Sequence, residues 1–538
     1  MVPENDGGAP YTRGVEEHPP RRRLAWSTAM FSLATGLSRV LGLIREMVAA
    51  YFFGASGKIN AFTVAFQIPN LLRSLVADQA LGSAFVPVFS ELLVKGDRKR
   101  AWHVASSVFF LMALGLGAVT AFGIIFAPLI IKPFGDPGGD VQLAIGLTRV
   151  LFPVVFLLGL SGIVVGILNS YDEFTVPAIT PVFWNLAIIL GLVLGVPNAH
   201  TINAKLYVYA FSILIGTVIQ VLIPLPWLFR LDGRLHVALD YRDPMVRRVF
   251  ALMIPVTLGL GLINFNAVVD TLFASRLLDP ELAPTAIDKA FRVYMLPQGL
   301  FSVAIATVLF PTMSRLAARA DWEGFRATVG LGLRQMAFLL IPASVTVAVL
   351  ATPIVRLLYQ RGAFTPEQTT VVAGALAAFS LGLTFNGAML MLNRAFFSLQ
   401  ENWIPTMVAL GNLALNALLD WAFYRLGVWG IPLSTSVVNI AGAAFLFWLL
   451  RERLDGLPLR PIIASVARIL VASAVLGAVA YGVWRGIDSL VGRRFIAQAA
   501  ALLGGIAAGT GAYVFCARLL GIREIDPLLG LRARFRRS

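Results

Sequence analysis

Cysteine and histidine are scarce in this chain, which limits the chemistry that it can perform. Its 538 residues include one cysteine, Cys516, and four histidines, which are His18, His103, His200 and His236. One cysteine excludes an intramolecular disulfide and any metal cluster held by cysteines. The histidines fall in expected tails, loops or helix ends and form no pair with the spacing of metal ligands, so no histidine metal site is predicted.

Charge is scarce as well. Charged residues make up 14% of the chain and hydrophobic residues 58%, whereas soluble domains average about 25% charged residues. The net charge of +15 comes from basic residues dispersed between apolar segments, so membrane topology explains it better than nucleic-acid binding. The sequence has no Walker loop, nucleophile elbow or HExxH motif, which argues against a pump ATPase or a common hydrolase, and we expect no enzyme.

Long apolar segments dominate what is present. A helix needs about 20 mostly apolar residues to span a bilayer, and about fourteen segments meet that length. They are residues 29–52, 61–94, 104–131, 141–169, 177–196, 205–229, 248–275, 286–316, 330–352, 368–399, 404–424, 430–450, 462–484 and 496–519. The sequence therefore predicts an all-α polytopic membrane protein with about 14 transmembrane helices.

The connections between these segments alternate in charge. Loops such as "KGDRKR" (95–100) and "RERLDGLPLR" (451–460) are rich in Lys and Arg. Roughly 25 such residues fall on the side that holds both termini, and about 11 fall on the other side. Because cytoplasmic loops carry more Lys and Arg, we expect both termini to lie in the cytoplasm.

The chain also repeats itself at a nearly constant offset. "SYDEFTVP" (170–177) matches "SLQENWIP" (398–405) at an offset of 228 residues, and Glu46 matches Asp270 at an offset of 224. Ordered matches of this kind predict two pseudo-symmetric six-helix lobes in the same orientation, as in many transporters. The predicted divisions are a disordered cytoplasmic tail (1–23), an N-lobe (24–230), a C-lobe (231–452), two further helices (453–520) and a basic cytoplasmic tail (521–538).

Charged residues inside the apolar segments mark a candidate substrate site. They are Arg39, Arg45 and Glu46 on the first helix, Arg73 and Asp78 on the second, and Arg292 on the eighth. Prolines break the second and eighth helices, and freed backbone is tolerated only beside protein or a cavity. We therefore expect these helices to line one central space, in which guanidinium groups bind a polyanion such as a diphosphate. The alternative is that each arginine reaches an interface or pairs with a carboxylate.

Asp78 is expected to serve an arginine on another helix. Arg73 and Asp78 are five residues apart with no proline or glycine between them. On a regular helix their side chains therefore point about 140° apart. A direct pair with Arg73 would need a break or unwinding of the helix between them. We favour the other option, in which Asp78 pairs with an arginine on another helix, such as Arg39 or Arg45, when the cavity is empty.

A second polar cluster is predicted in the C-lobe. Asp270, Asn416, Asp420 and Ser436 stand in apolar segments, beside Ser434 and Thr435. Asn416 and Asp420 are four residues apart and share a helix face. Carboxylate, amide and hydroxyl oxygens suit a hard cation such as Na⁺ or a proton relay. The alternative places Asp420 at a hydrated helix end and Asp270 near the outer interface.

Four stretches carry a resemblance to a known family. They are "SRVLGLIRE" (38–46), "NAFTVAFQIPNLLRSLVADQALGSAFVPVFSEL" (60–92), "LNSYDEFTVPAITPVFWN" (168–185) and "FRVYMLPQGLFSVAIATVLFPTMS" (291–314). In these stretches the chain resembles the MurJ/MviN family of lipid II flippases, within the multidrug/oligosaccharidyl-lipid/polysaccharide exporter superfamily. The resemblance implies a transporter in peptidoglycan biosynthesis that moves undecaprenyl-diphosphate-linked precursor (lipid II) to the outer leaflet of the bacterial cytoplasmic membrane.

The resemblance also implies site residues and partners. The family's cavity arginines correspond to Arg45, Arg73 and Arg292, with Arg39 as a further functional arginine, and some members bind sodium in the second lobe. No other cofactor is expected, and candidate partners are lipid II, membrane lipids and the cell-wall synthesis machinery. Two alternatives stay open: a cation-coupled exporter of drugs or other lipid-linked oligosaccharides, and a non-transporting paralogue.

The chain departs from the family pattern in three places, one of which is "ADQAL" (77–81), where the family commonly has "AEGAF". Asn60 stands where the family usually has an acidic residue, and Phe291 replaces the usual acidic residue before Arg292. Losing acidic partners is expected to leave the cavity more positive. This change would either alter proton or ion coupling or mark a diverged paralogue with another lipid-linked substrate.

The first residues are predicted to be dispensable for transport. Residues 1–23 have no apolar periodicity, so they cannot add to a packed core. Deleting residues 2–20 while keeping Arg21, Arg22 and Arg23 for orientation should leave flipping unchanged in a complementation assay. Loss of flipping by a deletion variant that still accumulates in the membrane would give the tail a functional role.

Overall fold

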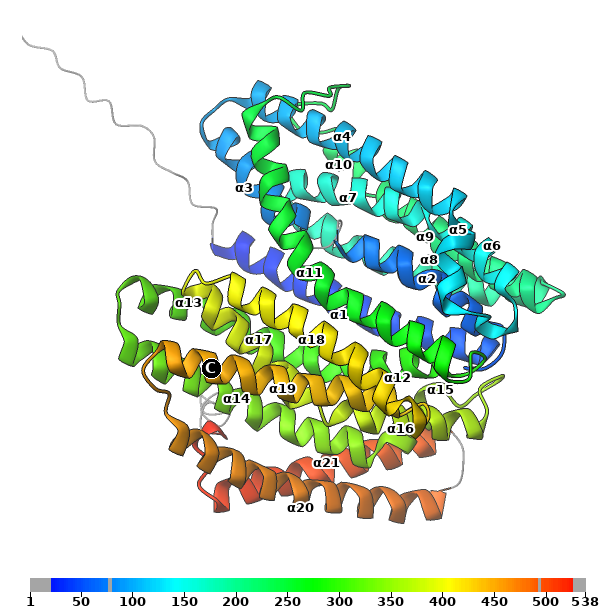
Figure 1. The fold of residues 1–538 in the computed structure, drawn as a ribbon, viewed down its shortest axis with the longest axis vertical. Helices are drawn as coiled ribbons and strands as arrows, with labels where there is room; N and C mark the ends of the chain where they lie inside the picture. The colour runs from blue at the N-terminus through cyan, green and yellow to red at the C-terminus, as the bar shows by residue number, and fades with distance from the viewer. Residues whose placement is uncertain (1–20, 76–79, 492–494, 526–538) are drawn as a thin grey trace, which may run out of the picture.

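The computed structural model describes residues 21–75, 80–491 and 495–525 (Figure 1). In these ranges all regular structure is helical. Ten helices are long and apolar enough to cross a membrane, and an eleventh span results if the bent pair α16–α17 is counted as one. The predicted all-α membrane-spanning character is thus confirmed. Asp78 and most of both expected tails lie outside the described residues.

The first part of the chain, up to the connection at residues 229–243, contains ten α-helices. They are α1 (Arg21–Phe53), α2 (Ile59–Arg73), α3 (Ala80–Val94), α4 (Arg98–Ile125), α5 (Ala127–Ile131), α6 (Val141–Leu151), α7 (Pro153–Ser170), α8 (Thr175–Gly195), α9 (Ile202–Leu222) and α10 (Leu225–Leu228). We call this part the first half. Its first helix starts at Arg21, three residues before the predicted start of the N-lobe.

The remaining helices follow that connection. They are α11 (Pro244–Leu277), α12 (Ala283–Pro297), α13 (Val303–Ala318), α14 (Trp322–Val349), α15 (Ala351–Tyr359), α16 (Pro366–Ser380), α17 (Leu383–Ser398), α18 (Trp403–Phe423), α19 (Gly430–Arg453), α20 (Leu459–Val491) and α21 (Phe495–Leu519). We call residues 244–453 the second half. The segments predicted at 29–52, 61–94 and 248–275 coincide with α1, α2–α3 and α11, which are not among the ten or eleven spans.

Two long helices run between two groups of helices. Figure 1 shows α2 to α10 in the upper group, α12 to α21 in the lower group, and α1 and α11 crossing between them. α1 packs against α8 of the upper group and α15 of the lower group, and α11 packs against α3 and α18. α20 and α21 pack against each other, and α20 also packs against α14. The first helix of each half therefore contacts both groups.

The internal repeat is visible in the helix bounds. α4 and α14 each have 28 residues, and their first residues, Arg98 and Trp322, differ by the predicted offset of 224. Each helix begins after an aspartate, Asp97 or Asp321, whose side chain accepts a hydrogen bond from a backbone N–H in the first turn. Such a cap satisfies a backbone donor that the helix leaves unpaired. The repeat thus extends from sequence to local geometry.

Helix breaks also recur in both halves. Pro69 lies in α2, and a π-helical turn follows at residues 74–75. Pro297 ends α12 and is followed by the π-helical segment η5 (Gln298–Ser302). Proline removes a backbone donor, and π turns absorb the resulting misfit. α2 ends at Arg73 and the π-helical turn follows it, so the described part of the stretch from Arg73 to Asp78 is not a continuous α-helix. The expectation for Asp78 itself falls outside the described residues.

Backbone hydrogen bonds join the two halves at one end of the molecule. The Gly57 N–H donates to the Glu281 carbonyl at 2.6 Å, the Gly138 N–H to the Pro280 carbonyl at 2.9 Å, and the Ala363 N–H to the Tyr51 carbonyl at 2.8 Å. Gly54 has φ of +67°, and a Cβ there would lie 2.6 Å from the Ala363 carbonyl oxygen. We call this end, formed by residues 51–63, 132–139, 275–285 and 359–368, the junction.

Asn60 is the most connected side chain of the junction. It is fully buried. Its Nδ2 donates to the carbonyls of Ala55, Gly57 and Glu281 at 3.2, 3.0 and 2.5 Å, and its Oδ1 accepts from the Thr285 N–H at 2.8 Å. An amide supplies both the donors and the acceptor that these four backbone groups require. An ionised carboxylate lacks the donors.

Asn60→Asp is predicted to weaken the junction. The substitution sets a carboxylate oxygen against three carbonyl oxygens, which costs on the order of 1–3 kcal/mol. A disulfide between Thr63→Cys and Thr285→Cys, whose native hydroxyls lie 2.8 Å apart, reports junction closure in a Cys516→Ser background. Its formation should slow about fivefold or more in Asn60→Asp.

The matched control for this experiment is Asn198→Asp. Asn198 is an exposed amide of the same half whose side chain bonds only the Leu194 carbonyl of its own turn. This control should leave disulfide formation unchanged. Equal rates in Asn60→Asp and the parent would show that Asn60 does not hold the junction together.

Candidate functional site

A single carboxylate gathers three cations from both halves of the chain. Glu46 lies on α1 and is 5% exposed. Its carboxylate is 2.8 Å from the Arg45 guanidinium, 2.6 Å from the Lys289 ammonium and 3.2 Å from the Arg292 guanidinium. Lys289 and Arg292 lie on α12 of the second half. We call Arg45, Glu46, Asp288, Lys289 and Arg292 the charge cluster.

Neighbouring groups hold each cation of the cluster in position. The Arg45 guanidinium lies over the Trp184 ring of α8 at 4.8 Å, and the Lys289 ammonium lies 5.5 Å from the centre of the Tyr359 ring. Asp288 accepts from the Arg292 Nε at 2.8 Å, one helical turn away. With three cations and two carboxylates the cluster has a formal surplus of one positive charge. It therefore favours an additional anion.

A small cavity of about 40 Å³ adjoins the charge cluster. Glu46, Lys289 and Arg292 line it, together with residues of α2 such as Thr63 and Asn70. This volume has room for a few waters, and a diphosphate is larger. The predicted meeting of the first, second and eighth helices is thus present as contacts, in an arrangement that must widen to admit a headgroup.

Arg39 and Arg73 lie outside the charge cluster. The Arg39 side chain is exposed and packs against Gly299 in η5, where a Cβ would lie 3.2 Å from its guanidinium. Arg73 donates to the Asn70 Oδ1 from Nε and Nη2, at 3.2 and 3.1 Å. Because Asn70 lines the cavity, Arg73 is linked to it through this amide. The expected partner Asp78 lies outside the described residues.

Lys289 and Asp288 are the site residues that sequence reasoning missed. Both stand in "DKAFRVYMLP", in the turn before Arg292. Helical spacing was the available signal, because Asp288 precedes Arg292 by four residues and such pairs share a face. Lys289 gave no such signal, since its partner Glu46 is 243 residues away.

Two of the three departures from the family pattern have structural explanations, and the third, "ADQAL" (77–81), lies largely outside the described residues. The side chain of Asn60 bonds only to backbone groups of the junction. The asparagine at this position therefore does not leave an arginine without its acidic partner. Phe291 packs against the rings of Tyr294 and Phe379, with centroids 5.8 and 5.6 Å away. Asp288 supplies a carboxylate to Arg292 instead.

The second polar cluster assembles inside the second half. The Asn416 Nδ2 donates to Asp270 at 2.6 Å and to Asp420 at 3.1 Å. Ser434 donates to Asp420, and Thr435 donates to Asp270 at 3.4 Å. Asp270 is 8% exposed, and Asn416 and Asp420 are fully buried. These five residues, which we call the acidic cluster, bring two buried carboxylates together. The alternative, a hydrated helix end for Asp420, is not what the structure has.

Ser436 is not brought to the acidic cluster. Its hydroxyl donates to the Ala378 carbonyl at 2.7 Å and accepts from the Gly382 N–H at 3.0 Å. It therefore satisfies backbone groups at the bend between α16 and α17. Ser434, two residues earlier, points to Asp420, because positions two apart on a helix do not share a face.

The acidic cluster has the donor set of a hard-cation site. All its free acceptors are oxygens, and the buried Asn416 Oδ1 has no hydrogen-bond donor among the described residues. Rotating that amide would present its oxygen to an ion between the carboxylates. No group of three or more His, Cys, Asp or Glu side chains with metal-site geometry occurs in the described ranges.

Comparisons with known proteins place this geometry in a family. The family model described as "Lipid II flippase MurJ" matches residues 49–495. The lipid II flippase MurJ of Burkholderia cenocepacia is 32% identical over 428 residues, which cover 78% of this chain and 82% of that protein. The probable lipid II flippase MurJ of Vibrio cholerae is 30% identical over 524 residues, covering 94% and 98%.

Solved structures agree on the fold. A structure of lipid II flippase MurJ in an inward closed conformation aligns with a TM-score of 0.75 and 26% identity, covering 91% of this chain and 99% of that one. An inward-facing multidrug resistance MATE transporter of the MOP superfamily aligns with a TM-score of 0.69 at 15% identity, covering 78% and 94%, and shares the fold alone. From the family model and these relatives, the chain belongs to the lipid II flippase MurJ family.

Proposed function

We propose that this protein is a lipid II flippase of the bacterial cytoplasmic membrane, which carries the undecaprenyl-diphosphate-linked precursor from the inner to the outer leaflet. The observation that carries the proposal is the charge cluster, in which α1 and α12 contribute three cations to one carboxylate. Membership of the family supports the choice of lipid II as the substrate. A diphosphate cannot cross hydrocarbon unaided, whereas a prenyl tail can remain in the bilayer.

Glu46 acts in this proposal as an internal substitute for the substrate. Without substrate, its carboxylate holds cations of both halves together. A diphosphate brings more negative charge and matches guanidinium forks, so it competes with Glu46 for Arg45, Lys289 and Arg292. Binding then loosens the link between the halves, and the cavity opens toward one side at a time.

The proposed function also requires a membrane topology, which consists of the number of spans, their division into lobes and their orientation. We infer fourteen spans, counting α1, α2–α3 and α11 with the eleven apolar ones, and two pseudo-symmetric six-helix lobes followed by α20 and α21. The equal lengths of α4 and α14, and the offset of 224 residues between their first residues, support the division into two lobes. The Lys and Arg distribution supports cytoplasmic termini. The junction then lies on the outer side, because the poorly charged connection 54–60 belongs to it.

The acidic cluster is proposed as the coupling site. Two buried carboxylates repel each other unless a cation or proton is shared. Na⁺ would be held by Asp270, Asp420 and the Asn416 amide, with hydroxyl groups of Ser434 and Thr435 nearby. A bound ion supplies a driving force of about 2.3 kcal/mol per charge per 100 mV of membrane potential.

Transport of a fluorescent lipid II across proteoliposome membranes tests the proposed function. Wild-type protein should move the label between leaflets, while protein-free liposomes should not. Selective transport of cationic drugs would instead indicate an exporter of the MATE kind. A folded protein that moves neither compound would be a non-transporting paralogue.

Lys289→Met is predicted to weaken binding of a prenyl diphosphate about tenfold or more. It removes a charge-assisted contact of about 1.5–3 kcal/mol and the positive surplus of the cluster. Lys289→Arg should keep much of the affinity. Lys205→Met, which removes a lysine of the first half that lies outside the cavity, is the matched control. Titration of geranylgeranyl diphosphate into purified protein measures the effect, and equal affinity for Lys289→Met and wild type would remove Lys289 from the site.

Glu46→Gln should act in the opposite direction. The variant loses the competing anion, so the diphosphate should bind more tightly. The free protein should melt at a lower temperature, because three cations lose their shared carboxylate. Thermal unfolding with and without the diphosphate measures both effects. A variant that is destabilised and also binds the diphosphate more weakly would show that Glu46 only supports the structure.

Asp420→Asn is predicted to abolish stabilisation of the full protein by Na⁺. Adding NaCl at constant ionic strength with choline chloride should raise the melting temperature of wild type and not that of the variant. Asp455→Asn, which neutralises an exposed carboxylate, should respond like wild type. If wild type itself shows no response to Na⁺ but unfolds differently with pH in an Asp420-dependent way, the shared ion is a proton.

A further inference from the structure

The connection between the two halves begins where a membrane span ends. Residues 229–243 link α10 to α11, and the candidate span Ile202–Leu228 stops at the residue before them. The connection lies on the side of the chain that is rich in Lys and Arg. Its first residues therefore lie at the depth where lipid headgroups meet water.

The connection is fixed to the first half at its tip. Asp232 accepts from the Tyr171 hydroxyl and pairs with Arg98 at 2.5 Å. A Cβ at Gly233 would lie 2.1 Å from the Trp102 Nε1, so only glycine fits against this indole. Burial, reinforced by the hydrogen bond to Asp232, raises the pKa of Tyr171 to about 12, so its hydroxyl stays protonated and keeps donating.

A second anchor follows three residues after Gly233. The His236 N–H donates to the Ser106 hydroxyl at 3.1 Å, and the His236 ring lies 3.3 Å from the Nδ1 of His103. The sequence did not suggest this histidine pair. Because the chain is held on both sides of Arg234 and Leu235, those two side chains have a defined direction.

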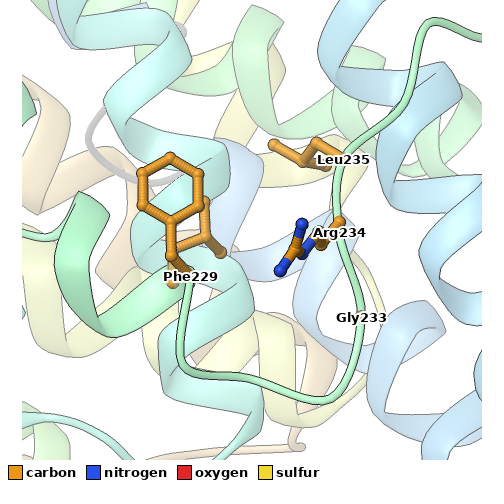
Figure 2. Close-up of a pocket in the computed structure, with 5 residues that line it drawn as sticks. Phe229, Gly233, Arg234 and Leu235 are labelled. Carbon is orange, nitrogen blue, oxygen red and sulfur yellow. The ribbon is translucent and has the colours of Figure 1, made fainter.

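Arg234 and Leu235 face a pocket of about 300 Å³ (Figure 2). Its lining consists of Leu228, Phe229, Gly233, Arg234 and Leu235. Figure 2 shows the Arg234 guanidinium directed into the space enclosed by the loop, with Phe229 and Leu235 on either side. Of the described carboxylates, none lies within ion-pair distance of Arg234, whereas Asp232 and Asp243 of the same loop pair with Arg98 and Arg100.

The surroundings of the pocket are basic and apolar together. Exposed apolar side chains of the connection include Phe229, Val237, Leu239 and Tyr241. Exposed cations without a carboxylate partner in the described residues are Lys99, Arg230, Arg242 and Arg247. Basic residues mixed with interfacial aromatics are typical of surfaces that contact an anionic leaflet.

We propose that the pocket at Arg234 binds the headgroup of an anionic phospholipid of the surrounding bilayer. The guanidinium takes the phosphate oxygens in a bidentate manner, and Phe229 and Leu235 contact the first carbons of the glycerol and acyl chains. A soluble phosphate would leave those apolar walls unused. This lipid is a resident ligand and not the transported substrate, so the proposal does not depend on flipping.

Native mass spectrometry of the detergent-solubilised full-length protein tests the proposal. Phosphatidylglycerol added at graded concentrations should bind wild type about tenfold more tightly than Arg234→Gln, because the variant loses a charge-assisted contact. Leu235→Ser should weaken binding as well. Arg319→Gln, which removes an exposed arginine at the end of α13, is the matched control and should bind like wild type.

Four outcomes overturn the proposal. One is equal phosphatidylglycerol binding by wild type and Arg234→Gln. Another is an equal loss in Arg319→Gln, which would indicate a general effect of charge. The third is displacement of the lipid by glycerol phosphate at the same concentration, which would indicate a site for soluble phosphates. A photo-crosslinker at position 235 that captures a protein in membranes, and no lipid, would also contradict it.

Discussion

A carboxylate that is buried away from water needs compensating positive charge. In this protein Glu46 obtains that charge in part from the opposite half of the chain. Its partners Lys289 and Arg292 come from α12, so the ion pairs that satisfy the buried acid also tie the halves together. Removing one partner of such a buried group is costly, because it leaves an uncompensated charge. The arrangement is therefore suited to respond to an incoming anion, and the cavity that Glu46 lines extends to the junction residues Thr63 and Thr285.

The repeat explains why the two acids at equivalent positions have different surroundings. Glu46 on α1 corresponds to Asp270 on α11. α1 packs against α8, and α11 packs against the equivalent helix α18. α18 offers Asn416 and Asp420, whereas α8 has Ile188 and Leu192 at the same offset of 228, both fully buried. An apolar face cannot satisfy a carboxylate. The Glu46 carboxylate consequently pairs with cations of the opposite half, whereas Asp270 forms hydrogen bonds within its own half.

Sequence reasoning predicted the features of the fold that depend on periodicity and hydropathy. The ten or eleven apolar spans of the described residues, the offsets of 224 and 228, the breaks after Pro69 and Pro297 and the arginines on α1 and α12 all follow from local pattern. Contacts between distant segments do not: Lys289 meets Glu46, and His103 meets His236, only because the fold brings them together. Ser436 was expected in the acidic cluster together with Ser434. The two residues are two positions apart on α19 and lie on different helix faces, so the Ser436 hydroxyl points to the bend between α16 and α17.

The side chain of Asn60 has a consequence for how the junction responds to its surroundings. A carboxylate at this position would have to bind a proton before it could donate to the carbonyls of Ala55, Gly57 and Glu281, so these contacts would vary with pH. A carboxamide has no proton to gain or lose in the physiological range. In this chain the closing contacts are therefore independent of pH, and sensitivity to protons or ions is left to the buried acids.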